Sequence, residues 1–456
     1  MNIKCLSALF ILGCCAVQAE ANPSSPLTLE DVLEASYFNN KEWCANRTDK
    51  RVADEKYKLS KRMFLPDIRA YVGTSRSKEE AGGNYNGIQV PDQTKMTTKT
   101  NLGIRVQQNL FNGFTTVNSM KAASFEADAA FHKLRLDEQK LIVKVIEAYA
   151  NVWFCVRRVD ALKKKEENLH KTLLSQQTSL EAGMITQTEV SSANADYNRA
   201  IFERISAETE LFSAEAEFEK ITGLKARKDL ELPSLELDLP KSLDKLIAHA
   251  LLSSNAILSA KFTEQAALKA LSAARGKLAP SCDLTLETGR SLSKVPKVNE
   301  GVNNYSASLE VSIPINVSQN NLYSQIEIAN QQALKTKFTA EEAVLETKKE
   351  CVKNWNLYIA TDAMIKSSKT AVESEELNSE SYIEQTALGM KSNTDIWVRE
   401  NKLLDSRIGL ADSQRRKIVA SVNLLMQTGD LSMHSLLSKI KKSPSKTTNK
   451  KVIKVS

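Results

Sequence analysis

The sequence predicts a mostly helical chain that also carries two β-hairpins of the membrane β-barrel type. The chain contains no proline between Pro91 and Pro233 or between Pro314 and Pro444, so two long stretches lack the strongest helix breaker. Apolar and polar residues alternate with a period of two before each predicted long helix. The whole pattern then occurs twice along the chain, which predicts an internal two-fold repeat.

The first residues, 1–19, are predicted to be a secretory signal. An apolar run from Leu6 to Val17 follows Lys4, and a small residue at Ala19 suits cleavage after that position. Lipoprotein processing at Cys14 is the alternative. The run is too short to cross about 30 Å of hydrocarbon, and no later stretch reaches about 18 apolar residues. An exported chain of this kind is either soluble outside the cytoplasm or inserted in a membrane as a β-barrel.

The net charge of +7 comes from the end of the chain. Residues 438–456 contain seven lysines and no acidic residue, which leaves a balance of zero for the rest. Residues 430–456 are therefore predicted to be a basic, disordered tail, with binding to an anionic surface as the alternative. The charge does not form a face for nucleic acid, so we expect no nucleic-acid partner.

The sequence contains no pattern that indicates catalysis or a cofactor. The cysteines after the signal, at positions 44, 155, 282 and 351, have no metal-binding spacing. They are expected to be buried free thiols, with one disulfide bridge in an oxidising compartment as the alternative. The four histidines are far apart, and no nucleophile elbow, zinc-protease motif or phosphate loop is present. We expect no metal, no cofactor and no enzymatic activity.

The two repeats are predicted at residues 20–223 and 241–429, joined by a linker at 224–240. Gly183 and Gly389 are 206 positions apart, and Pro66 and Pro280 are 214 apart. Each repeat contains a strand hairpin, at 67–110 and 282–315. Each also contains a helical hairpin, with its tip near 183–188 and near 389–394. The change in offset lies between Pro66 and Gly113, where a surface loop would tolerate a different length.

The helix predicted from about 115 to 182 would be roughly 100 Å long. Its apolar residues follow a heptad spacing, which favours a coiled coil over an ordinary amphipathic helix. Gly183 and Gly389 then begin the turns into returning helices at 187–221 and 393–427, which end at Gly223 and Gly429. The heptad residues are Ile142, Val145, Tyr149, Val152, Val156 and Val159.

Four strands of about ten residues are predicted, with polar loops at 76–97 and 291–303. This length suits a tilted membrane strand with an apolar face toward lipid and a polar face toward a lumen. Arg105 and Glu310 are expected on the lumen side. A small soluble sheet is the alternative, but two hairpins in a membrane cannot close and need other copies of the chain. The residues expected to face lipid are Leu102, Ile104, Leu309 and Val311.

Several motifs together resemble the TolC-like outer-membrane efflux protein family over nearly the whole mature chain. They are Leu27-Thr28-Leu29-Glu30-Asp31, Leu65-Pro66, Gln108-Asn109-Leu110-Phe111-Asn112-Gly113, Glu147-Ala148-Tyr149, and the turns Gly183 with Thr188-Glu189-Val190 and Gly389 with Thr394-Asp395-Ile396. Each motif is weak alone, whereas their order, spacing and duplication are specific. Asn109 replaces the usual proline of the strand-to-helix turn.

The resemblance implies a homotrimer in the outer membrane of a Gram-negative bacterium. Three copies of four strands would form a twelve-stranded barrel, and the helices would continue it as a periplasmic tunnel. Residues 224–240 and the region after Gly429 would form a belt around the tunnel. The channel would be passive. It would export drugs, small molecules or, by type I secretion, proteins, when docked to a periplasmic adaptor and through it to an inner-membrane transporter.

The resemblance also implies roles for residues at the two helical tips. Asp395, Lys391, Glu189 and Thr188 match positions of a periplasmic gate, although Val398 and Thr386 depart from the family pattern. The tips themselves would contact the adaptor. These tip residues are Gly183, Met184, Gly389 and Met390. A periplasmic coiled-coil scaffold is the alternative function, but it does not explain two matched strand hairpins.

Overall fold

The computed structural model describes residues 27–85, 88–232, 242–295, 298–315, 321–433 and 436. The predicted signal at 1–19, residues 233–240 of the predicted linker and most of the basic tail lie outside the described residues.

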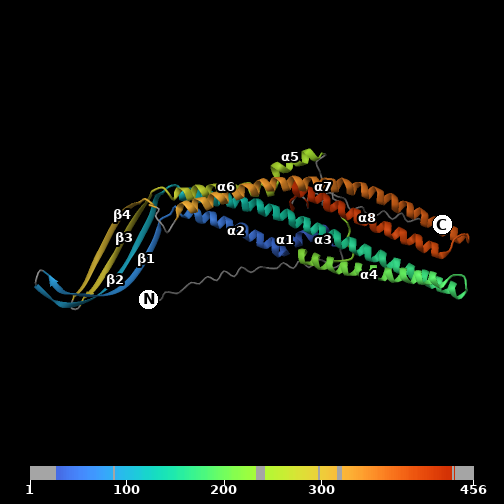
Figure 1. Ribbon diagram of the computed structural model, residues 1–456, viewed down its shortest axis with the longest axis horizontal. Helices are drawn as coiled ribbons and strands as arrows, with labels where there is room; N and C mark the ends of the chain where they lie inside the picture. The colour runs from blue at the N-terminus through green and yellow to red at the C-terminus, as the bar shows by residue number, and fades with distance from the viewer. Residues whose placement is uncertain are drawn as a thin grey trace, which may run out of the picture.

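The described chain is elongated, with strands at one end and helical tips at the other (Figure 1). Four long helices account for its length: α3 (Thr115–Glu181), α4 (Gln187–Thr222), α7 (Leu322–Ala387) and α8 (Asn393–Thr428). The 67 residues of α3 span about 100 Å at 1.5 Å per residue. The long breaker-free helices expected from the sequence are therefore confirmed. None of the described helices is both long and apolar enough to cross a membrane.

The strands form one antiparallel sheet in the order β1-β2-β3-β4. Their bounds are Asp67–Tyr85, Ile88–Asn112, Ser281–Val295 and Val298–Ser312. The prediction of ten-residue strands with loops at 76–97 and 291–303 was wrong, because most of both stretches is strand. Backbone pairing continues where both faces become polar, so the alternation of side chains marks only part of each strand.

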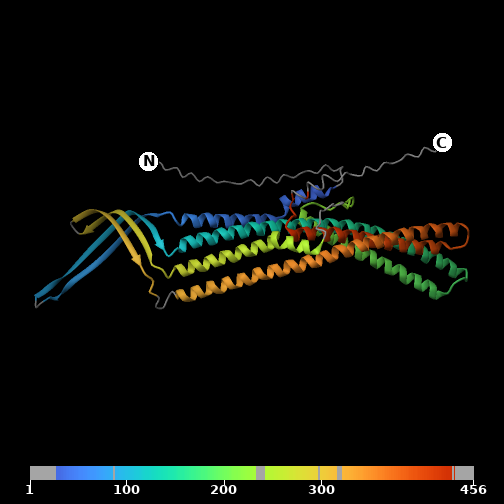
Figure 2. The same cartoon turned by 90° about the horizontal axis from the view of Figure 1, so that it is seen from above.

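The helices form a single curved layer (Figure 2). Beside the strands, contacts run from α2 (Lys41–Arg62) to α3, from α3 to α6 (Asn255–Gly276), and from α6 to α7. Beyond the middle, α4 and α8 contact α3 in place of α2 and α6. The short helices α1 (Leu29–Asn39) and α5 (Leu243–Ser253) lie at this changeover, so each repeat contributes the same parts.

The main hydrophobic core lies at the changeover, around the middle of α3. Five of the six predicted heptad residues are buried there, and Val156 is half-buried. Leu141 and Ile146, outside the heptad positions, are buried too. The burial is wider than a coiled-coil seam because α1, α4 and α8 all contact α3, and their side chains Leu33, Phe218 and Leu425 join the same cluster.

Candidate functional site

The sheet separates its side chains into one apolar and one polar face. Residues paired directly across antiparallel strands share a face. Ile104 pairs with Ala70 and Thr288, whereas its neighbour Arg105 pairs with Arg69 and Glu287. The apolar face contains rows such as Ile68–Val106–Leu286–Ala307 and Leu284–Leu309. The predicted phase is therefore confirmed, since Leu102, Ile104, Leu309 and Val311 share the apolar face, opposite Arg105 and Glu310.

The polar face is organised by a cluster that links three strands. The hydroxyl of Tyr71 donates to the carboxylate of Glu287, which also forms an ion pair with Arg105 at 3.2 Å. Tyr71 reaches across Gly103 and Gly289, where any added Cβ would collide with its hydroxyl or with backbone. These glycines thus give the aromatic ring room to cross the sheet. The sequence analysis did not identify this cluster, because its members lie up to 216 positions apart.

The described four-stranded sheet has two edge strands, each unpaired along one side. In the described sheet β1 pairs only with β2, and β4 pairs only with β3. Each outer strand therefore presents unpaired backbone N–H and C=O groups along one side. Because exposed edges are not tolerated in hydrocarbon, the two edges must be covered by other strands if the apolar face meets lipid.

Hydrogen bonds at the changeover join the ends of separate helices. The side-chain amide of Asn40 donates to the carbonyl of Ile221 at 3.0 Å, while its oxygen accepts the backbone N–H of Trp43 at 2.9 Å. It thereby connects the last turn of α4 to the first turn of α2. In the second repeat the hydroxyl of Ser253 donates to the carbonyl of Thr428 at 2.5 Å. The returning helix thus ends against the start of α2 in the first repeat and against the last residue of α5 in the second.

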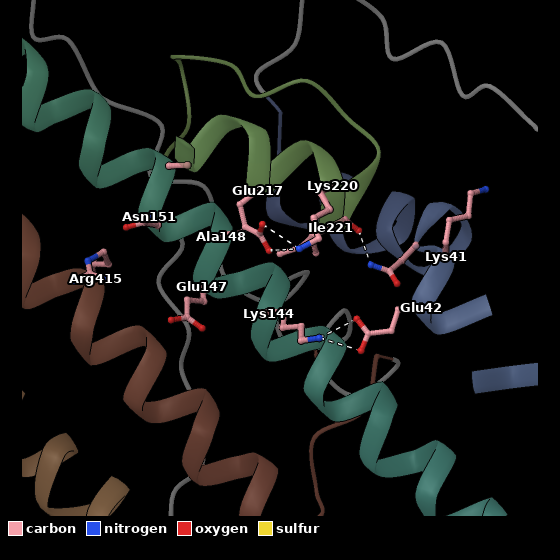
Figure 3. Close-up of a pocket in the computed structure, with 12 residues that line it drawn as sticks. Lys41, Glu42, Lys144, Glu147, Ala148, Asn151, Glu217, Lys220, Ile221 and Arg415 are labelled. Carbon is pink, nitrogen blue, oxygen red and sulfur yellow. Dashed lines mark hydrogen bonds and ion pairs between the residues drawn. The ribbon is translucent and has the colours of Figure 1, made fainter. Parts of the chain in front are cut away.

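A pocket of about 550 Å³ lies at the first of these junctions (Figure 3). Lys144 of α3 points toward Glu42 of α2 in that view, with their charged atoms 2.9 Å apart, and Lys220 pairs with Glu217 at 3.1 Å. The hydrogen bond and charge of Lys144 lower the pKa of Glu42. The charged side chains that line this pocket are largely paired, which suits a structural junction rather than a reactive centre.

The first helical tip, between α3 and α4, is held by an apolar cluster and a helix cap. Leu173, Val190 and Ala193 are buried against one another. The carboxylate of Glu189 accepts the backbone N–H of Thr186 at 2.8 Å, which completes a capping box at the start of α4. Thr188 and Met184 are exposed, and Met184 retains 78% of its accessible surface.

The second tip, between α7 and α8, has the same helix cap, but its side-chain contacts involve a tyrosine and two cationic residues. The carboxylate of Asp395 accepts the backbone N–H and the hydroxyl of Ser392, both at 3.0 Å, and these bonds lower its pKa. Lys391 lies over the ring of Tyr382 at 5.4 Å. Arg399 lies over the same ring at 4.7 Å and donates to its hydroxyl at 3.1 Å.

The four predicted gate residues are thus divided between two separate tips. Within the chain, Glu189 and Asp395 each bind their own helix terminus, and Lys391 contacts Tyr382. Tyr382 and Arg399 were not among the tip residues expected from the sequence. A comparison of the repeats could have indicated them, because at the offset of 206 the first tip has Gln176 and Ala193 in their places, so the aromatic and cationic pair is specific to the second tip.

The described residues contain no group of three His, Cys, Asp or Glu side chains that could hold a metal ion. Cys155 and Cys351 are buried and free, and burial raises the pKa of Cys351 to about 11. Cys44 and Cys282 are half-buried and free, so the expectation of buried thiols is correct for two of the four.

Solved structures with the same fold span nearly the whole chain. A membrane protein from Pseudomonas aeruginosa superposes with a TM-score of 0.73 at 15% identity, covering 89% of this chain and 91% of that one. The CmeC outer membrane channel of Campylobacter jejuni gives a TM-score of 0.72 at 15% identity, covering 91% and 89%. The fold of this chain is therefore shared with these proteins over nearly its whole length.

Relatives in sequence agree with the structural likeness. The outer membrane efflux protein BepC of Brucella suis is 26% identical over 411 residues, which cover 90% of this chain and 87% of BepC. The outer membrane protein TolC of Escherichia coli is 20% identical over 428 residues, covering 90% and 84%. The sequence profile of outer membrane efflux proteins matches residues 36–224 and 246–430, one segment for each repeat. The chain therefore belongs to the outer membrane efflux protein family.

Proposed function

We propose that the chain is one third of a passive trimeric channel that crosses the outer membrane and continues through the periplasm as a helical tunnel. The observation that carries this proposal is the four-stranded sheet with one apolar face and two open edges. Three copies joined edge to edge would give twelve strands, an even number typical of outer-membrane barrels. Membership of a family of channels also favours conduction over catalysis.

Exposed apolar side chains on the long helices support assembly with further copies. On α7, Ile328, Phe338 and Leu345 retain 69%, 62% and 65% of their accessible surface. On α4, Phe202 and Phe212 retain 72% and 69%. Among the described elements α7 contacts only α5, α6 and α8 to any extent, so part of its surface is uncovered. Large exposed apolar surfaces mark interfaces between proteins, and neighbouring copies would cover these.

The helical tips are the proposed contact with a periplasmic adaptor, which would link the channel to an energised inner-membrane transporter. Gly183, Met184, Gly389 and Met390 form the outermost turns, and Met390 retains 71% of its accessible surface. Flexible, exposed methionine side chains suit a docking surface. Relatives include proteins named for efflux and, in Pseudomonas aeruginosa, the alkaline protease secretion protein AprF. Both small molecules and proteins therefore remain candidate cargo.

A gate at the tips is also proposed, with Asp395 repeated three times around the bore and Lys391 reaching Thr188 or Glu189 on the neighbouring hairpin. Rings of carboxylates in a wet constriction favour cations. An exposed ion pair contributes only about 0.2–1 kcal/mol, so such a lock could yield to an adaptor that binds the open form better. Lys391 would have to leave the ring of Tyr382 to make that contact.

Light scattering of the purified protein in detergent, followed by recordings in planar bilayers, tests the channel proposal. We expect three chains per particle and stable single-channel conductance. A monodisperse monomer that stays folded without detergent would instead support the alternative function, a periplasmic coiled-coil scaffold.

A further inference from the structure

Basic side chains gather on the outer part of the apolar face of the sheet. On this face the described strands carry four cationic residues, and all lie toward the hairpin turns, away from the helices. Arg76 and Lys294 flank Thr98 in one row, and Arg290 lies two rows nearer the helices, in the row of Val72 and Leu102. The fourth cation, Lys78, is neutralised by an ion pair with Glu80.

The three remaining cations are exposed, and the guanidinium of Arg76 donates to the sulfur of Met96 at 3.4 Å. Among the described residues no acidic side chain forms an ion pair with Arg76, Arg290 or Lys294. Strands in a sheet lie about 4.8 Å apart, so Arg76 and Lys294, two strands from each other, have Cα atoms about 10 Å apart. That spacing lets two long side chains converge on one anionic group.

Arg290 is also directed toward the outer border. Its Nη2 and Nε atoms lie 3.0 and 3.2 Å from the position that a Cβ on Gly301 would occupy. Gly301 pairs with Leu292, one row nearer the hairpin turns than Arg290 itself. The absent side chain at Gly301 thus makes room for the guanidinium to lie over β4, one row nearer the outer border and on the side of β3 away from Arg76.

We propose that Arg76, Arg290 and Lys294 form a binding site for the phosphate groups of lipid A, the phosphorylated glycolipid of the outer leaflet. Basic side chains at the border of an apolar surface extend into the headgroup region, and arginine binds phosphate through parallel hydrogen bonds. In Figure 1 the strands extend away from the long helices, so in a barrel whose helices reach the periplasm the outer part of the sheet would meet the outer leaflet. The site rests on the trimeric barrel proposed above, which presents it three times.

Native mass spectrometry of the detergent-solubilised trimer, titrated with bisphosphoryl lipid A, tests the site. The triple variant Arg76→Gln, Arg290→Gln, Lys294→Gln should bind about 100-fold more weakly, since each basic residue near an anionic surface contributes about a fivefold effect. Lys99→Gln is the matched control. Lys99 pairs with Ser75 and Ser293 at nearly the same height but on the polar face, so its loss should change binding by less than about twofold.

Equal binding by the triple variant and the parent would overturn the site, as would an equal loss in Lys99→Gln. Phosphatidylglycerol binding as tightly as bisphosphoryl lipid A would overturn the assignment to lipid A. If the triple variant does not assemble, Arg290→Gln alone should weaken binding about fivefold, and unchanged binding would refute the role of Arg290. The same spectra report the number of chains, so a trimer without the lipid preference refutes this site and leaves the channel proposal intact.

Discussion

Replacing Ile104 by arginine should block assembly, whereas replacing Gln107 should not. Ile104 lies on the apolar face, in a row with Ala70 and Thr288. From Cys282 to Leu292 this face extends about 34 Å along β3 at 3.4 Å per residue. At a tilt near 40° this corresponds to about 26 Å of membrane height, close to the usual apolar band. Thr288 lies near the middle of that distance, so Ile104 lies near the bilayer midplane.

Arginine at the midplane of a barrel costs about 2–4 kcal/mol per chain. Three copies would cost about 6–12 kcal/mol if the effects add, which approaches the whole stability of a typical domain. Gln107 shares the polar face with Asp67 and Thr285, so arginine there should change stability by less than about 0.5 kcal/mol.

Urea titration of both variants folded into lipid vesicles measures these costs, and heat-resistant trimers on gels report assembly in cells. An equal loss of stability in Ile104→Arg and Gln107→Arg would show that the apolar face does not meet lipid.

Three further predictions concern the tip, the belt and the tail. Asp395→Asn keeps an oxygen that can cap α8 but removes the charge, so cation selectivity in planar bilayers should fall. Ser392→Ala should weaken the helix cap by about 0.5–2 kcal/mol and leave the cation selectivity unchanged. The pKa of Asp395 is lowered from 3.8, so the parent's selectivity should be constant from pH 7 to pH 5, and the carboxylate's contribution to stability should be lost only as pH falls through that lowered pKa. Tyr149→Phe removes a 2.8 Å hydrogen bond to the carbonyl of Glu231 and should cost about 0.5–1.5 kcal/mol in denaturant titrations, with no loss of conductance. Truncation after Leu437 should leave the trimer intact on native gels, whereas Leu436→Ala should destabilise it by about 2–5 kcal/mol because that side chain is 1% exposed.

The repeat, the long helices and the two faces of the sheet could all be predicted from the sequence. Each of these features depends on local composition or on a short sequence period. Helix-breaking residues are few around α3, and apolar and polar residues alternate strictly around Ile104 and Leu309. Thr186 with Glu189, and Ser392 with Asp395, likewise have the spacing of a capping box, and the structure forms both. Strand length could not be predicted in this way, since strands continue beyond Val72 and Leu102 where neither face is apolar.

The periodic pattern by itself determined which faces of the helices and strands are apolar, because side-chain direction follows from backbone geometry within a few residues. Only the tertiary structure decided which distant groups meet. Asn40 caps α2 and also binds the carbonyl of Ile221, 181 positions away. Tyr382 lies between Lys391 and Arg399 only because a hairpin returns beside it, and Arg290 lies over Gly301 only because β3 pairs with β4 in one register. Such contacts depend on how separate segments pack, which no local period encodes.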